Sequence, residues 1–112
     1  MPIGTPKLHL LAYDIADPKR LTQVHHTVRE WGVPLQYSVF LVYANRLGLD
    51  SLIVQLDAII HPTEDDIRIY PLPSRIEMIH YGRQVLPEGV ELVGGRLSGD
   101  RIAGLAEAAE AR

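Results

Sequence analysis

The residues whose side chains are best suited to binding or catalysis lie together in the segment 13–20, YDIADPKR. Asp14 ends an apolar run, and Lys19 and Arg20 follow Asp17-Pro18, a pair typical of the start of a helix. Free N–H groups and the dipole at a helix start favour anions, and Lys and Arg pair with phosphate. A carboxylate beside such a position can hold Mg²⁺, with water and phosphate completing the octahedron. Asp14 is therefore a candidate metal ligand, and Lys19 and Arg20 are candidate contacts to phosphate.

The same segment has a purely structural interpretation. Asp14 would then accept hydrogen bonds from the loop that enters the helix, or pair with Arg20. Asp17 is expected to cap the helix, and so carries little weight as a ligand. A single carboxylate is weak evidence for a metal site. In a dimer, however, a twofold axis near the strand end would bring two copies of Asp14 together. Two carboxylates with a bridging metal can activate water for phosphodiester cleavage.

Other polar residues of the chain are expected to be structural. His25 and His26 point about 100° apart on a helix, so they cannot share a metal, and we expect both at the surface. Ser38 has no nucleophile-elbow pattern around it and is placed within a strand. The run Glu64-Asp65-Asp66 lacks the spacing of a calcium loop and is interpreted as a solvated turn.

Apolar spacing predicts the elements that must position the candidate site. Residues 7–15 form a strand whose two faces are both largely apolar. A helix follows Asp17-Pro18 and ends at Gly32. The residues expected on its buried stripe are Leu21, Val24, Val28 and Trp31. Residues 35–43 read as one second strand, again apolar on both faces.

The second half of the chain continues with one helix and further strands. Asn45 is expected to cap a helix that Pro62 stops from continuing. Its buried stripe is predicted to contain Leu49, Leu52, Ile53, Leu56, Ile59 and Ile60. The ranges 66–71, 75–81 and 90–93 are read as the remaining strands, the last one short.

This order of elements fits an α+β fold, a ferredoxin-like βαββαβ sheet with an extra C-terminal strand and both helices on one face. The bare face then needs a partner, so we expect a homodimer packed sheet to sheet. Residues 1–95 are assigned to the ferredoxin-like domain. Residues 96–112 form an Ala-rich C-terminal tail, either helical or flexible.

Composition narrows the class of protein. The 112 residues include no cysteine, which excludes disulfides, thiolate metal sites and a cysteine nucleophile. No apolar run approaches the ~20 residues of a membrane helix, and the start lacks a secretory signal, so we expect a cytoplasmic protein with no membrane contact. The net charge of −3 argues weakly against a free-standing nucleic-acid binder, and binding would depend on local cations or on a more basic partner.

Three segments, LLAYDIADPKRL, VHHTVREWGVPLQYSVF and DDIRIYPL, together resemble the small CRISPR-associated adaptation protein. This family is the non-integrase subunit of the spacer-acquisition complex and is also described as an endoribonuclease. The resemblance runs from Leu8 to Leu72 and implies a ferredoxin-like homodimer that holds duplex DNA, with RNA as the other candidate substrate, together with the integrase subunit. It also implies that Asp14 is the Mg²⁺-associated residue of a metal-dependent endonuclease and that Arg20 contacts nucleic acid.

The sequence departs from the family pattern directly after Phe40. Many relatives carry an acid there, whereas this chain has Leu41. In such proteins the C-terminal strand can add to the partner's sheet, and residues 90–93 are the candidate here. Two alternatives stay open, a non-catalytic ferredoxin-like regulatory or protein-binding module and a toxin-like ribonuclease acting alone, because a fold does not fix a function.

Overall fold

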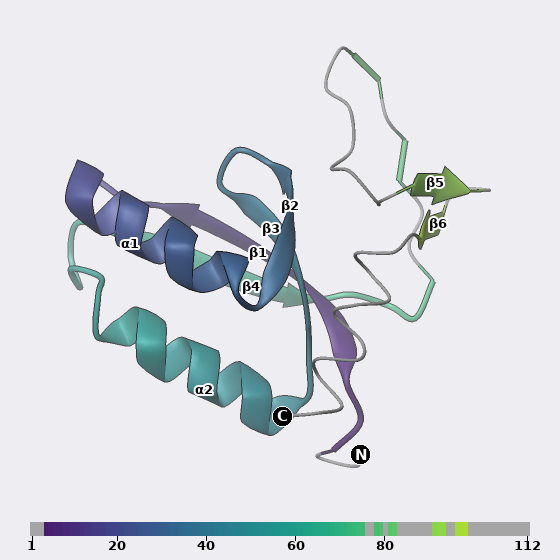
Figure 1. Ribbon diagram of the computed structural model, residues 1–112, viewed down its shortest axis with the longest axis horizontal. Coiled ribbons are helices and arrows are strands. Elements are labelled where there is room, and N and C mark those ends of the chain that lie inside the picture. Colours follow the sequence, from purple (N-terminus) through teal and green to yellow (C-terminus); the bar gives the residue numbers. More distant parts are fainter. Residues whose placement is uncertain (1–3, 76–77, 80, 83–90, 94–95, 99–112) are drawn as a thin grey trace.

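The computed structural model describes residues 4–75, 78–79, 81–82, 91–93 and 96–98, and every structural statement below concerns these residues. Its first six elements follow one another in the order strand, helix, strand, strand, helix, strand (Figure 1). They are β1 (Lys7–Asp14), α1 (Pro18–Arg29), β2 (Gly32–Gln36), β3 (Val39–Ala44), α2 (Arg46–Asp57) and β4 (Asp66–Pro71). Neither helix is long and apolar enough to cross a membrane.

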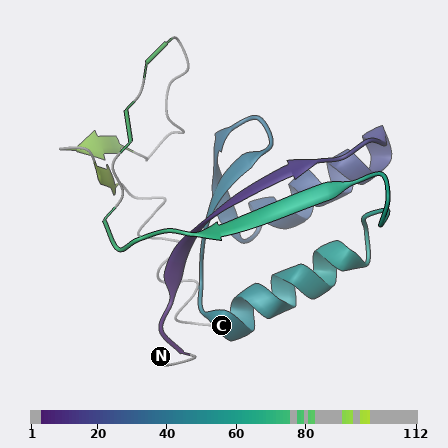
Figure 2. The ribbon, with the colours of Figure 1, turned by 180° about the vertical axis from the view of Figure 1, so that it is seen from behind.

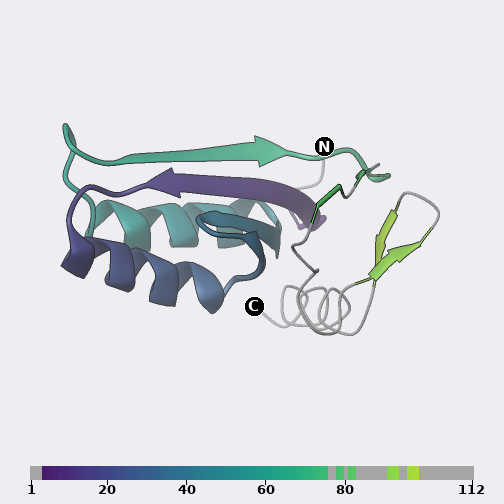
Figure 3. The same cartoon turned by 90° about the horizontal axis from the view of Figure 1, so that it is seen from above.

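The four strands form one antiparallel sheet in the order β2-β3-β1-β4. Both helices cover the same face of this sheet, as Figure 3 shows from above, and Figure 2 shows β4 and β1 from behind. The predicted α+β ferredoxin-like βαββαβ core is therefore confirmed. β1 lies at the centre of the sheet, and its C-terminal end leads directly into α1.

Two side-chain caps start the helices where the sequence predicts them. The Asp17 carboxylate accepts a hydrogen bond from the Arg20 backbone N–H at 3.0 Å, and Pro18 opens the first turn. The Asn45 side chain accepts one from the Gly48 N–H at 2.8 Å. Each cap satisfies a backbone donor that the helix itself cannot pair.

The main core lies between the helices and the inner face of the sheet. Its fully buried side chains include Leu11, Val24, Val28, Phe40, Val42 and Leu52. The predicted stripe of the second helix is correct at Leu52 and Leu56, but Ile53 is 45% exposed, so its placement in the core was wrong. Ile59 and Ile60 pack against the core from beyond the helix end.

The outer face of the sheet is also apolar, as predicted. Val33 and Leu41 are buried there and form a second cluster with the partly buried Leu8, Leu35, Tyr43 and Leu72. After β4 the chain returns to β1, where the Leu72 N–H donates to the Leu8 carbonyl at 2.9 Å. Part of this face is therefore covered within one chain, while Leu10 and Ala12 stay half-buried.

The predicted single strand over residues 35–43 is wrong, because the chain turns there. β2 ends at Gln36 and β3 begins at Val39, and between them Tyr37 and Ser38 make a two-residue turn. Ser38 has a φ of 65°, a left-handed conformation that non-glycine residues adopt rarely. Gln36 and Val39 pair across the turn and are three residues apart, so the turn alone would invert the alternation of faces. The irregularity in register between Pro34 and Gln36 restores it, so Leu35 and Leu41 share the outer face and the pattern does not reveal the reversal.

Gly32 does not act as the helix terminator that the sequence predicted. α1 ends at Arg29, Trp31 lies in the following turn, and Gly32 is the first residue of β2. A Cβ atom at Gly32 would lie 2.2 Å from the Leu41 carbonyl oxygen. Glycine is required here because two backbones approach each other closely, as glycine alone permits.

The strands predicted after β4 differ from those observed. No described residue between Arg75 and Tyr81 belongs to a strand, so the prediction of a strand over 75–81 fails for them. β5 (Glu91–Val93) falls in the predicted range 90–93, but it pairs with β6 (Arg96–Ser98) in a separate two-stranded sheet. Val90, Gly94-Gly95 and residues 99–112 lie outside the described residues, and the domain division after residue 95 stays a prediction.

Candidate metal and nucleic-acid site

Asp14 is the last residue of β1, and its side chain lies on the outer face of the sheet, away from both helices. The residue is exposed, and no described residue makes a hydrogen bond or an ion pair with its carboxylate. The structural interpretation of Asp14, as an acceptor for the helix-entry loop or a partner of Arg20, is therefore wrong. The carboxylate remains available to a ligand.

Asp66, the first residue of β4, lies directly opposite Asp14 in the antiparallel pair. Directly opposite residues of neighbouring strands share a face, so both carboxylates lie at the same end of the outer face. Asp66 also accepts a hydrogen bond from the Arg68 Nε at 3.0 Å. Sequence reasoning missed this pair because only the register of β1 and β4 brings residues 52 positions apart together.

The two predicted cations at the start of α1 lie in different surroundings. Lys19 is exposed and free to contact a partner. Arg20 is held by the segment between α2 and β4: its Nε donates to Asp65 Oδ2 at 2.8 Å and its Nη2 donates to Glu64 Oε1 at 2.9 Å. Only 23% of the Arg20 side chain is exposed.

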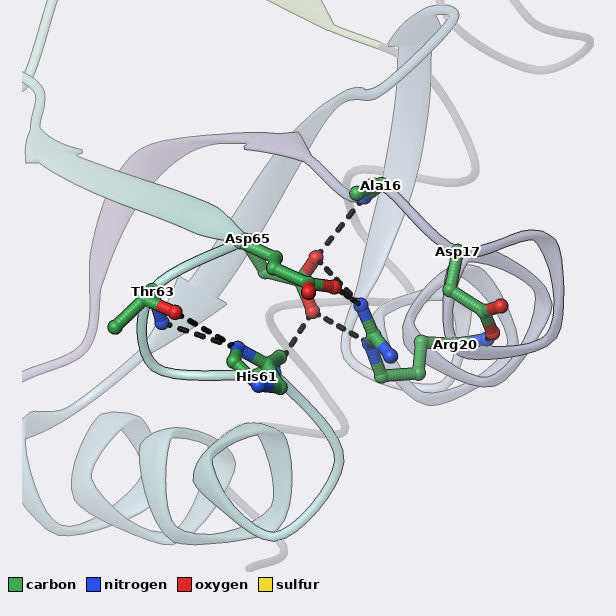
Figure 4. A network of polar contacts seen from close by, with 7 residues as sticks. Ala16, Asp17, Arg20, His61, Thr63 and Asp65 are labelled. Carbon is green, nitrogen blue, oxygen red and sulfur yellow. Dashed lines mark hydrogen bonds and ion pairs between the residues drawn. The ribbon is translucent and has the colours of Figure 1, made fainter.

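The Asp65 carboxylate is the buried centre of this network (Figure 4). Its side chain is 0% exposed. Oδ1 accepts hydrogen bonds from the Ala16 N–H at 2.9 Å and from Arg20 Nη2 at 3.3 Å. Oδ2 accepts them from Arg20 Nε and from the His61 N–H, both at 2.8 Å. The prediction of a solvated acidic turn is therefore wrong for Asp65, which joins three segments of the chain.

These contacts shift the proton affinities of both partners. The Arg20 guanidinium lowers the pKa of Asp65 well below its usual value. Burial opposes that shift, and the His61 and Ala16 N–H groups support it. The Asp65 carboxylate in turn raises the pKa of Arg20 above its usual value. The pair is therefore charged over the whole physiological range of pH, with its donors and acceptors matched.

A second set of contacts holds β1 just before Asp14. The Tyr13 hydroxyl lies 2.9 Å from His25 Nδ1 on α1, and the Tyr13 N–H donates to the Ser38 carbonyl at 3.1 Å. The His25 ring meets Phe40 edge-on, with centroids 5.4 Å apart. His26 is exposed as predicted, but His25 is half-buried and joins α1 to the sheet, so its placement at the surface was wrong.

The described residues contain no group of three or more His, Asp or Glu side chains arranged to hold a metal. The opposed carboxylates of Asp14 and Asp66 fit Mg²⁺, which is often bound by one or two carboxylates with water and phosphate supplying the other ligands. A cavity of about 570 Å³ lies at the opposite end of the sheet, beside Lys7, His9 and Arg46. None of Asp14, Lys19 and Arg20 lines it.

Comparison with known proteins shows the family to which this chain belongs. The family model described as CRISPR associated protein Cas2 matches residues 7–77, a range that includes Asp14, Lys19, Arg20 and Asp65. The chain belongs to the Cas2 family. The resemblance seen in the sequence motifs is therefore confirmed.

Two curated Cas2 relatives cover most of the chain. The "CRISPR-associated endoribonuclease Cas2 1" of Nitrosomonas europaea is 40% identical over 85 residues, which is 76% of this chain and 81% of the relative. The "CRISPR-associated endoribonuclease Cas2 2" of Thermodesulfovibrio yellowstonii is 36% identical over 86 residues, 75% of this chain and 93% of the relative.

Solved structures agree with the fold. The hypothetical protein TT1823 of Thermus thermophilus has a TM-score of 0.64 at 28% identity, and the match covers 70% of this chain and 96% of the TT1823 chain. Streptococcus pyogenes Cas2 has a TM-score of 0.59 at 27% identity, and the match covers 65% of this chain and 99% of the Streptococcus pyogenes chain. A further Cas2 crystal structure, 23% identical, shows the same fold with a TM-score of 0.66.

Proposed function

We propose that this chain is the dimeric, non-integrase subunit of a CRISPR spacer-acquisition complex and that it cleaves phosphodiester bonds with Mg²⁺ at Asp14. The observation that carries the proposal is the unengaged carboxylate of Asp14, exposed at the end of β1 within the segment that matches the Cas2 family. Two of its curated relatives carry the name endoribonuclease.

The dimer is proposed to form through the outer face of the sheet. Leu10 and Ala12 are half-buried there beside the buried Leu41, so a second copy would remove further apolar surface from water. A twofold axis near the end of β1 would bring the two Asp14 residues of the dimer toward each other. Leu41 belongs to this apolar face.

Asp14, with Asp66 opposite it, would hold the Mg²⁺. When bound, such a metal polarises the phosphate and lowers the pKa of the attacking water. The residues of the chain have separate tasks: Asp14 presents its oxygens, Arg68 balances the charge of Asp66, and Lys19 offers an exposed ammonium to the phosphate backbone. Arg20 stands beside Lys19 as the second candidate contact, although its Nε and Nη2 are engaged by Asp65 and Glu64.

Nucleic-acid binding is proposed to be shared with the integrase subunit. The chain carries a net charge of −3, and a dimer doubles it, so the field of the whole molecule repels DNA. Local cations such as Lys19 and a basic partner would have to supply the attraction. Duplex DNA is the proposed ligand of the complex, and RNA is the other candidate substrate for cleavage.

The experiment compares Asp14→Asn with wild type on labelled duplex DNA and on RNA, with and without Mg²⁺. We expect Mg²⁺-dependent cleavage in wild type and a loss of about 100-fold or more in Asp14→Asn, at unchanged far-UV circular dichroism and unchanged binding of nucleic acid. Asp57→Asn, an exposed acid at the end of α2, is the matched control and should keep full activity. Full activity in Asp14→Asn would refute the catalytic role.

The second candidate function is a non-catalytic regulatory or protein-binding module. The small number of acids that the fold brings together favours it, since no group of three faces a common point among the described residues. Wild type that fails to cleave either substrate, and that also fails to bind duplex DNA at low salt or to co-purify with an integrase-like protein, would support this candidate over the first.

A further inference from the structure

Asp14 is the last residue of a strand, and strand ends are where a sheet opens most easily. Only Ile15 and Ala16 separate it from Asp17, the residue that caps α1. The position of the Asp14 carboxylate therefore depends on what fixes this short connection. Ile15 of this connection packs in the main core, and the carboxylate of Asp65, which lies outside the connection, holds the Ala16 N–H.

Asp65 reaches both sides of the corner where β1 leaves the sheet and β4 enters it. It accepts the Ala16 N–H, two residues beyond Asp14. It is also the chain neighbour of Asp66, which pairs with Asp14 across the strands. Its remaining bonds come from Arg20 on α1 and from the His61 N–H beyond α2. One side chain thus connects the end of β1, the start of α1 and the start of β4 (Figure 4).

We propose that Asp65 and Arg20 are positioning residues that hold Asp14 in place, and that Arg20 acts through Asp65 rather than by contacting phosphate. This inference rests on the proposed function of Asp14, and it assigns to this pair the task of fixing the catalytic strand end. An ionised carboxylate that is fully buried must be paired and hydrogen-bonded. Asp65 meets that requirement with donors from three separate segments, which then cannot move independently.

The geometry of Arg20 argues against a direct role on phosphate. A guanidinium recognises phosphate best through two parallel N–H groups on one edge. The edge formed by Nε and Nη2 is taken by Asp65, and Nη2 also serves Glu64. A phosphate would have to displace a buried carboxylate or use the remaining Nη1 group. Lys19, the residue before Arg20, is exposed and is not part of this network.

The test compares Asp65→Asn and Arg20→Gln with two matched controls. Glu64→Gln removes only the exposed arm of the network, since the Glu64 side chain is 54% exposed. Lys19→Gln removes a neighbouring cation that is free of the network. Arg20→Lys is a milder variant that keeps the positive charge but loses the paired hydrogen bonds from Nε and Nη2 to Asp65. If either stronger variant fails to fold, the same measurements are made on Arg20→Lys.

The first readout is hydrogen exchange at individual amides. Asp65→Asn and Arg20→Gln should each speed exchange of the Ala16 and His61 amides by about tenfold or more, while the Val28 amide inside α1 keeps its protection. The double variant should add little to either single one, because both break the same network. A merely destabilising effect would instead speed exchange at all three amides alike.

The second readout is the salt dependence of duplex DNA binding. Each neutralised phosphate contributes about 0.9 to the slope of log affinity against log salt. Lys19→Gln should reduce that slope, whereas Arg20→Gln should leave it unchanged. Asp65→Asn, which frees Arg20, should leave it unchanged as well. If Arg20→Gln lowers the slope as Lys19→Gln does and spares the Ala16 amide, Arg20 is a phosphate contact and the proposal is overturned.

The third readout is cleavage, where both variants should lower kcat and leave KM near that of wild type. Glu64→Gln should behave as wild type. If wild type itself does not cleave, the proposed catalysis fails, while the exchange and salt readouts still decide between positioning and phosphate contact. Equal kcat in wild type and in a folded Asp65→Asn variant would overturn the positioning role while leaving the role of Asp14 intact.

Discussion

Asp14 and Asp66 stand directly opposite each other on β1 and β4, so two acids share one end of the outer face of the sheet. Like charges placed opposite each other across strands are unfavourable. The fold compensates one of them through Arg68, whose Nε donates to Asp66 at 3.0 Å, and leaves Asp14 without a partner among the described residues. The sheet thus keeps a local excess of negative charge at the end of β1.

The first prediction concerns this repulsion. Asp14→Asn should raise the free energy of unfolding by a few tenths to about 1 kcal/mol at low salt, because it removes the opposed charge that has no partner of its own among the described residues. The gain should shrink as salt screens the pair. Thermal unfolding at several salt concentrations measures it, and the double variant Asp14→Asn/Asp66→Asn should gain no more than Asp14→Asn alone, because either change removes the repulsive pair. A drop in stability at every salt concentration would mean that the two carboxylates do not repel each other.

The second prediction uses the low pKa of Asp65. The folded carboxyl has a pKa below its ordinary value of 3.8, so its ionised form stabilises the fold fully above pH 3.8. That stabilisation is lost as the pH falls through the folded pKa. The difference in melting temperature between wild type and Asp65→Asn should therefore be largest near neutral pH and shrink steadily below pH 3.8. A difference that stays constant down to acid pH would contradict the ionic role of Asp65.

The third prediction concerns His9, the buried polar residue on the inner face of β1. Burial lowers its pKa below 6.5, and its Nδ1 has no hydrogen-bond partner among the described residues. The neutral ring stabilises the fold fully above pH 6.5, and this stabilisation is lost as the pH falls through the folded pKa. Wild type should therefore lose stability between neutral and mildly acid pH, and His9→Leu should lose less.

Denaturant unfolding over that range of pH tests the role of His9. His26→Leu is the control, because His26 is exposed on α1 and should keep the dependence of wild type. The idea fails if both variants follow the wild-type curve, since the loss would then come from other groups.

Local chemistry explains why parts of the fold were predictable from the sequence. Asp17 and Asn45 cap the helices with their own side chains, so the starts of both helices are visible within four residues. The apolar run of β1 is visible in the same way. Asp14 at the strand end was found because these two signals, an ending strand and a starting helix, meet there.

The rest depends on contacts between distant residues. The turn at Tyr37 and Ser38 has no Gly, Pro or Asn, and tertiary contacts such as the bond from the Tyr13 N–H to the Ser38 carbonyl accompany it. Asp65 looks like any acid in a polar turn until the fold brings Ala16 and Arg20 to it. Residues whose partners lie 45 and 49 positions away leave no local pattern.

The fourth prediction tests the close approach at Gly32. In Gly32→Ala the new Cβ would meet the Leu41 carbonyl oxygen at 2.2 Å, so β2 and β3 must separate. We expect a loss of about 2 kcal/mol or more in the free energy of unfolding, a cost typical of overpacking. Gly4→Ala is the control, because no atom lies within 4 Å of its Cβ, and it should change stability by less than about 0.5 kcal/mol. Equal stability of the two variants would contradict the packing argument.

The fifth prediction tests the proposed dimer. Leu10 lies on the outer face of β1, half-buried between Leu41 and the partly exposed Tyr70 on the neighbouring strands. Leu10→Arg would place a charge in the proposed interface, where its desolvation is costly, so wild type should sediment as a dimer and this variant as a monomer. Val54→Arg carries the same charge on α2, on the helix side of the sheet, at a position already 69% exposed.

Sedimentation velocity at micromolar concentration compares the three proteins, and circular dichroism verifies that each is folded. Val54→Arg should remain a dimer, because α2 lies on the side of the sheet opposite to the outer face. If Val54→Arg dissociates while Leu10→Arg does not, the copies meet through the helices. The two Asp14 residues would then lie on opposite outer surfaces, and a metal shared between them would be impossible.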